Sequence, residues 1–163
     1  MVVSKEITKA NVVEFSNYIL KHYGPMSHLK LQKLLYYCEA YHLAYFEAPL
    51  INENFQAWVH GPVCREVYDI LKDKSILYSD IAFDNLSNPD TEIERLSTTQ
   101  LNLIEDVLKS LVKWTDLELE AATHKEQPWL TARKGYSPNQ RCEIEIDKNE
   151  MRIFYQKESE SWQ

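Results

Sequence analysis

Apolar side chains recur at helical spacing from the start of this chain. Between residues 8 and 23, Val12, Phe15 and Ile19 fall three or four positions apart and therefore share one helix face. Thr8 is a candidate N-cap, because its hydroxyl can accept a hydrogen bond from a free amide of the first turn. The glycine–proline pair that follows cannot continue a helix. The pattern predicts a first helix over 8–23.

The second helical pattern, over 28–46, is apolar on almost every side, and Ser27 is its candidate N-cap. One face carries a continuous apolar-to-aromatic stripe, and the opposite face has few polar residues as well. A helix that is apolar nearly all round is buried, so we expect this helix to be the centre of the fold. The stripe consists of Leu31, Leu34, Leu35, Cys38, Tyr41, His42 and Tyr45.

The middle of the chain is less regular and holds the β-prone segments. Residues 54–59 are aromatic and lie between asparagines and a glycine–proline pair, which predicts a short strand. That proline suits the first position of a third helix, which we expect over 62–72. Clusters of Ser, Asp, Asn and Pro make 73–96 an irregular loop. Within it, 76–78 and 81–83 are candidate short strands that pair with 54–59.

The C-terminal half has recognisable helix starts. Two of them are capping boxes, in which a Ser or Thr precedes a Gln or Glu by three residues. Lys134 and Gly135 end a short helix, and we expect the polar tail, 158–163, to be frayed. The predicted starts are Ser97 with Gln100, Thr115 with Glu118, Pro128, and Asp147 with Glu150.

Together these patterns predict a mainly α fold: a compact bundle of about six helices around a buried central helix, with a small β element. The length of 163 residues favours a single domain over 1–163. Aromatic residues make up 12%, with ten tyrosines and four tryptophans. Such side chains suit either a contact surface or an aromatic core, and the sequence leaves both open.

Charge, cysteine usage and hydropathy restrict the partners and the location. The formal net charge is −7, and an acidic chain covers phosphates poorly, so we expect no direct nucleic-acid binding. The acidity suits solubility or a basic protein partner. Three dispersed cysteines without a signal peptide indicate a reducing cytoplasm. No apolar run approaches ~18 residues, so we expect no membrane insertion.

The compact motifs of common enzyme classes are missing from the sequence. Its three glycines stand alone, which excludes a glycine-rich phosphate loop, and there is no zinc-protease, hydrolase or kinase signature. His60 and Cys64 are four positions apart, but a glycine–proline pair intervenes and two ligands do not make a zinc site. We therefore expect no catalytic residues, no metal and no cofactor.

One enzymatic alternative stays open, namely a thiol nucleophile beside an imidazole base. Its thiol is Cys38 or Cys64, and its imidazole is His42, His60 or His124. A buried thiol beside a hydrogen-bonded imidazole explains the same residues, and we favour that interpretation.

Two features are candidates for partner binding. Lys33, Tyr36 and Tyr37 sit at helical spacing, so the ammonium lies against phenol rings. If this face is exposed it is an anchor patch, and if it is buried Lys33 only extends along apolar neighbours. His124 and Trp129 flank a proline turn, where they form either a recognition corner or a core plug with a histidine hydrogen-bonded to the turn. We favour the core plug.

Three runs in this order resemble the Panacea antitoxin domain, formerly a domain of unknown function found in many prophage-encoded proteins. The resemblance covers about 25–155, nearly the whole chain. The runs are Lys30-Leu31-Gln32-Lys33-Leu34-Leu35-Tyr36-Tyr37, Ala57-Trp58-Val59-His60-Gly61-Pro62-Val63 and Thr123-His124-Lys125-Glu126-Gln127-Pro128-Trp129.

The resemblance implies a mostly helical antitoxin that is encoded beside its cognate toxin in bacteria, phages or mobile elements, in settings such as phage defence. Family members accompany very different toxins, and the resemblance brings no catalytic residues. It leaves open whether the chain inhibits its partner directly or is an adaptor that delivers the partner to a protease or chaperone, and whether it forms a homo-oligomer. The candidate partner-binding residues are Lys33, Tyr36, Tyr37, Trp58, His60, His124 and Trp129.

Overall fold

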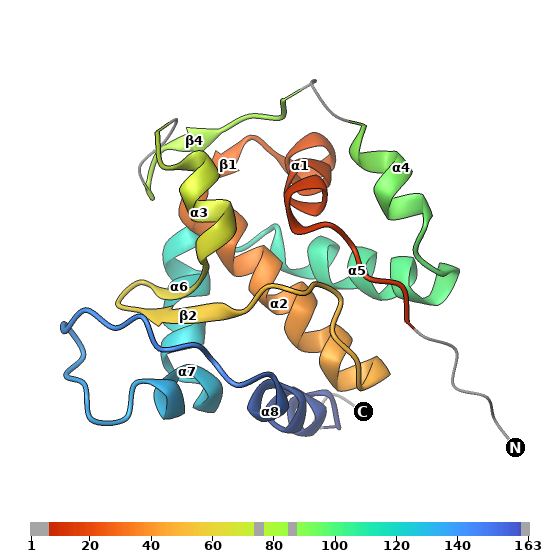
Figure 1. Ribbon diagram of the computed structural model, residues 1–163. Coiled ribbons are helices and arrows are strands. Elements are labelled where there is room, and N and C mark those ends of the chain that lie inside the picture. Colours follow the sequence, from red (N-terminus) through yellow and green to blue (C-terminus); the bar gives the residue numbers. More distant parts are fainter. Residues whose placement is uncertain (1–6, 74–76, 85–87, 161–163) are drawn as a thin grey trace, which may run out of the picture.

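The computed structural model describes residues 7–73, 77–84 and 88–160 (Figure 1). Within these ranges the chain forms eight helices and two small two-stranded sheets, which confirms a mainly α fold with a small β element. The elements are α1 (Val12–Tyr23), β1 (Met26–Ser27), α2 (His28–Phe46), β2 (Phe55–Trp58), β3 (Gly61–Cys64), α3 (Arg65–Leu71), β4 (Asp80–Ile81), α4 (Pro89–Glu94), α5 (Thr98–Leu111), α6 (Asp116–His124), α7 (Gln127–Ala132) and α8 (Lys148–Glu160).

The central helix of the fold is α2, as the sequence predicts. It has the predicted bounds and the predicted cap, with the Ser27 hydroxyl accepting from the Lys30 amide at 3.1 Å. Figure 1 shows α2 crossing the middle of the molecule, and it packs against α1, α5, α6, α8 and the strand β3. Residues on all of its sides are buried, from Leu29 to Ala44. The low polarity of the whole helix surface is therefore explained by neighbours on every side.

One of these neighbours is held by a buried ion pair. The carboxylate of Glu39, which has no exposed surface, accepts from Lys148 Nζ at 2.7 Å and from the Leu50 amide at 2.6 Å. The same ammonium donates to the carbonyl of Ile51 at 2.9 Å. Burying a carboxylate without a partner costs roughly several kcal/mol of folding free energy. These bonds offset that cost and hold the start of α8 against α2.

The β elements differ from the predicted pairing. Strand β2 pairs with β3, from Phe55 opposite Cys64 to Trp58 opposite Gly61, and β4 pairs with β1. The sequence predicted that 76–78 and 81–83 pair with 54–59. That prediction was wrong for Ile81, which lies opposite Met26 of β1. Ile76 lies outside the described residues. The reason is that the chain reverses at Gly61 and supplies the partner of β2 immediately.

This reversal also moves the start of the third helix. We expected it at 62, but residues 61–64 are extended and α3 begins only at Arg65. Gly61 has φ +98°, a backbone conformation that favours glycine and produces a tight turn. The segment before α8 adds a further neighbour to β2, through the Ala57 amide to the Ile144 carbonyl at 2.8 Å.

Many helix ends follow the local signals. The capping boxes at Ser97 and Thr115 are both formed, and the Asp147 carboxylate accepts from the amides at the start of α8. The first helix is capped by Asn11 instead of Thr8, because Asn11 Oδ1 accepts from two first-turn amides at 3.0 Å. Helix α4 arises inside the segment predicted to be an irregular loop. Helix α8 runs to Glu160, into the predicted tail, and 161–163 lie outside the described residues.

Candidate functional site

The turn between β2 and β3 is where the three sequence runs meet. A Cβ on Gly61 would lie 2.6 Å from Lys33 Cε and 2.8 Å from Thr123 Oγ1, so this backbone is in close contact with α2 and α6 at once. Lys33 Nζ donates to the carbonyl of Pro62 at 2.8 Å. We call this turn, with the residues of α2, α6 and α7 that contact it, the hairpin corner.

Lys33 is entirely buried in the hairpin corner. Its side chain has no exposed surface, and burial lowers the pKa of its ammonium to about 7, although the nearby Glu120 carboxylate opposes that shift. Tyr36 and Tyr37 are buried as well, at 0% and 4% exposure. Of the two alternatives for this face of α2, the structure shows burial, because β3 and α8 cover it. These residues therefore form no exposed anchor patch in this structure.

Trp129 fills the core of the corner and bonds to the hairpin. Its Nε1 donates to the carbonyl of Trp58 at 2.8 Å, and its side chain is 6% exposed. The ring of His124 stacks on it at 4.3 Å between centroids. Burial lowers the pKa of His124, and a hydrogen bond with the Val59 backbone opposes that shift. This arrangement is the core plug that the sequence favoured.

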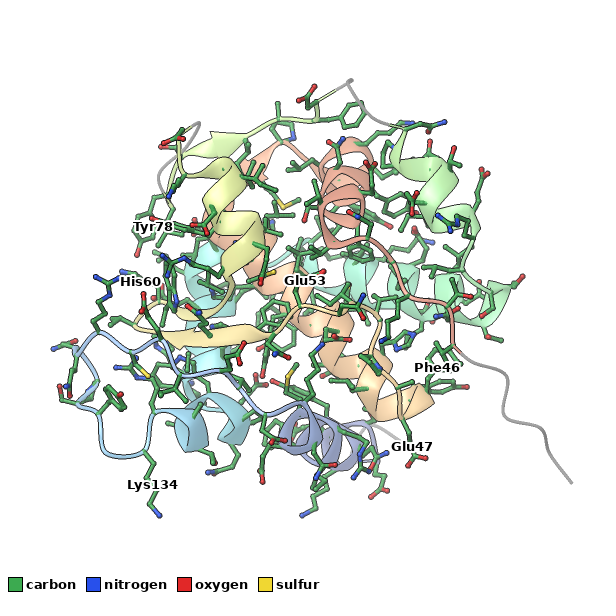
Figure 2. The ribbon with its side chains drawn as sticks, in the orientation of Figure 1. Phe46, Glu47, Glu53, His60, Tyr78 and Lys134 are labelled. Atoms are coloured by element: carbon green, nitrogen blue, oxygen red, sulfur yellow. The ribbon has the colours of Figure 1, made fainter. Side chains whose placement is uncertain are left out.

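His60 is the half-exposed polar group of the corner, with 42% of its side chain exposed. Its Nδ1 lies 2.9 Å from Glu120 Oε1 and 3.1 Å from the Tyr78 hydroxyl. Figure 2 shows His60 and Tyr78 on the same side of the molecule, from the hairpin and from the loop after α3. Together with the half-buried Trp58, His60 forms the part of the corner that reaches solvent.

The three runs are therefore in contact in the folded chain. Comparison with known proteins shows the family to which the chain belongs. The family model described as "Antitoxin SocA-like, Panacea domain" matches residues 31–130, more than half of the chain. The chain belongs to this family. The matched range includes the hairpin, α6 and most of α7, and it therefore contains Lys33, Gly61 and Trp129 of the hairpin corner.

A curated member of the family is similar along most of the chain. Antitoxin SocA of Caulobacter vibrioides (strain NA1000 / CB15N) is 32% identical over 120 residues. That alignment spans 71% of this chain and 64% of the relative, so the chain covers slightly less than two thirds of the relative's length. No solved structure matches the chain.

Arg133 completes the corner of this Panacea domain, and the sequence reasoning missed it. The guanidinium is 4% exposed and donates to the carbonyls of Ala57 and Ser137, each at 2.8 Å. It also lies 5.1 Å from the Trp129 ring centroid. An arginine at the end of a short helix carries no local signal for such a role, because its acceptors come from β2 and from the loop after α7.

A second carboxylate-centred cluster lies apart from His60. Glu126 Oε1 accepts from the hydroxyls of Tyr37 at 2.7 Å and Tyr155 at 2.8 Å, and burial raises the pKa of this carboxyl. Tyr155 also donates to the Tyr36 hydroxyl at 3.2 Å. Glu126 lies inside the third run, but no local pattern in the sequence distinguishes it from its neighbours. The tertiary contact with α2 and α8 reveals it.

The thiol–imidazole alternative finds no support in the geometry. Cys38 and Cys64 are buried, and burial raises the pKa of both thiols, to about 12 for Cys64. His42 Nδ1 lies 2.6 Å from the Ala48 carbonyl and its Nε2 lies 3.0 Å from Gln100 Nε2, so both nitrogens are occupied. Neither thiol is therefore an activated nucleophile.

Within residues 7–73, 77–84 and 88–160, no group of three or more His, Cys, Asp or Glu side chains is placed to hold a metal ion. None of the helices in those ranges combines the length and the apolar character needed to cross a membrane.

Proposed function

We propose that this chain is an antitoxin that neutralises a cognate toxin by binding it directly. The observation that carries the proposal is the match to the SocA-like antitoxin family over residues 31–130. The 32% identity to an antitoxin of Caulobacter vibrioides also supports it. The toxin is expected to be the product of a neighbouring gene.

The packing of the domain supports binding in preference to catalysis. Three side chains that could act as a base or a nucleophile are buried, namely Lys33, Cys38 and Cys64. The Lys33 ammonium donates to the Pro62 carbonyl. A neutralising protein needs a stable scaffold with an accessible surface, whereas an enzyme needs exposed groups arranged around a substrate. The hairpin corner supplies such a scaffold, because polar contacts with one turn join α2, α7 and, through His60 and Glu120, α6.

The experiment is co-expression in bacteria. The chain is expressed alone and together with each immediate genomic neighbour, and growth and co-purification are measured. The proposal predicts one neighbour that stops growth alone and is silenced by this chain in a stable complex. If no neighbour is toxic and none co-purifies with the chain, the proposed function is wrong.

A further inference from the structure

An open groove of about 570 Å³ lies on the side of the domain formed by α5, α6 and α8, next to α2. Its floor is aromatic and apolar, with Tyr37 and Tyr41 from α2 and Leu111 from α5. Trp114, in the connection between α5 and α6, forms part of its wall with 43% of the residue exposed. We call this the aromatic groove.

The charges in the aromatic groove all have one sign. Asp106, Glu126 and Glu158 line it, from α5, the start of α7 and α8. Among its lining residues, all in the described part of the chain, there is no lysine, arginine or histidine. Asp106 is exposed, so its carboxylate is hydrated and available for pairing.

Glu126 is the most deeply placed of the three carboxylates. Its Oε1 already accepts from two tyrosine hydroxyls, which fix the orientation of the carboxylate in the floor. The negative charge of Glu158 acts on Glu126 in the same direction as burial, and both raise the pKa of the Glu126 carboxyl. A cation entering the groove would relieve this repulsion and would meet phenol and indole rings, whose faces attract ammonium and guanidinium groups.

We propose that the aromatic groove is the docking surface for the toxin, and that it takes a segment presenting apolar side chains around a lysine or arginine. The inference rests on the proposed function and adds to it the surface and the chemistry of the partner. Aromatic side chains anchor many peptide interfaces, and carboxylates of one sign around them favour a partner segment of the opposite charge. A partner of opposite charge is also drawn to the whole domain, whose net charge is −7.

The choice of a basic partner segment over a second copy follows from charge. Two acidic chains repel each other at long range, and a second copy would have to overcome that repulsion before any contact formed. The exposed part of the hairpin corner, Trp58 with His60, is the competing surface for the toxin. It carries one carboxylate, Glu120, which is already paired with His60.

The first arm of the test measures affinity. The probe is the neighbour-encoded protein that co-purifies with this chain, and its dissociation constant is measured by calorimetry or biolayer interferometry. Asp106→Lys and Trp114→Ala are each expected to weaken binding by about tenfold or more, and Glu126→Gln to weaken it while retaining an acceptor for the tyrosines. Higher salt is expected to weaken the wild-type complex.

Matched controls separate the groove from general effects. Glu94→Lys, on α4, makes the same change in net charge at another exposed position, and Tyr136→Ala removes an aromatic residue of comparable exposure, 37%. His60→Ala tests the competing corner. These three variants are expected to leave the dissociation constant within about twofold. If His60→Ala weakens binding and the groove variants do not, the groove assignment is overturned and the proposed function stands.

The second arm identifies the segment that occupies the groove. Trp114→benzoylphenylalanine and Tyr136→benzoylphenylalanine chains are irradiated in the complex, and the cross-linked peptides are sequenced by mass spectrometry. The proposal predicts a toxin peptide from position 114 that contains lysine or arginine among apolar residues. A peptide without a basic residue, a peptide from a second copy of this chain, or cross-links from position 136 alone would overturn it. Failure to obtain any complex would overturn the proposed function as well.

Discussion

The ammonium group of Lys33 and the carbonyl group of Pro62 are joined by a 2.8 Å hydrogen bond in a part of the molecule that has no contact with solvent. This bond connects the central helix to the hairpin turn and explains why a lysine is tolerated in a helix that is otherwise surrounded by the core. Its position leads to a prediction about pH.

Lys33→Met is expected to reduce the pH dependence of stability between pH 7 and pH 9. In that window the unfolded chain keeps the Lys33 proton, with an ordinary pKa of 10.5, while the folded chain, with a pKa of about 7, releases it. Unfolding therefore takes up a proton, and the wild-type free energy of unfolding should rise relative to the variant by about 2 kcal/mol. Denaturant titrations at several pH values measure this. Parallel curves for the two proteins would show that Lys33 does not titrate in this range.

Gly61→Ala is expected to destabilise the domain by about 2–4 kcal/mol. The new methyl group would lie 2.6 Å from Lys33 Cε and 2.8 Å from Thr123 Oγ1, at a φ of +98°. Gly135→Ala is the control, because Gly135 has φ +91° but nothing within 4 Å of the added Cβ, so only about 1 kcal/mol of backbone strain is expected. If urea unfolding shows the same loss of unfolding free energy for both variants, close packing at the hairpin corner is not the reason that position 61 requires glycine.

Lys148→Met is expected to cost about 3–5 kcal/mol, because it leaves the buried Glu39 carboxylate without its cation. Lys157→Met removes an exposed lysine from the same helix and should change stability by less than about 0.5 kcal/mol. In the double variant Glu39→Gln with Lys148→Met, most of the loss should be recovered. Thermal unfolding of the wild type, the two lysine variants, Glu39→Gln alone and the double variant checks this, and additive losses would contradict the pairing.

The three cysteines are expected to be unreactive in the native protein. Cys38, Cys64 and Cys142 are all buried free thiols, and the raised pKa values of Cys38 and Cys64 leave these two with little thiolate at neutral pH. A disulfide-exchange reagent at pH 7 should label them only as fast as the protein unfolds, and all three in denaturant. Rapid labelling of Cys38 or Cys64 in the folded state would revive the thiol–imidazole alternative.

The parts of this fold that follow from local sequence were predictable. The bounds of α2, its Ser27 cap and the capping boxes at Ser97 and Thr115 depend on residues within one or two helical turns. The pairing of β1 with β4 joins Met26 with Ile81 and Ser27 with Asp80, which are 55 and 53 positions apart, and periodicity holds no information on it. Register and partner choice in such short strands come from packing.

The candidate site likewise has some features that follow from local sequence and others that depend on tertiary packing. The three runs identified the elements that meet at the hairpin corner and favoured a buried Trp129, but they left open whether Lys33 is buried there. The partners that give the corner its chemistry, such as Glu120 for His60 and Arg133 for the Ala57 carbonyl, come from elements 60 to 76 positions away. Burial and long-range pairing are tertiary properties, and a motif read from one sequence does not contain them.

The most direct measurement of the central claim is the amount of toxin in cells during neutralisation. The neighbour-encoded toxin and this chain are expressed from separate inducible promoters, and growth, complex formation and toxin abundance are followed together. Direct binding predicts that growth recovers while the toxin persists at full abundance in a stable complex. Recovery that accompanies disappearance of the toxin, with no stable complex, would contradict direct neutralisation and would favour an adaptor that delivers the toxin to a protease.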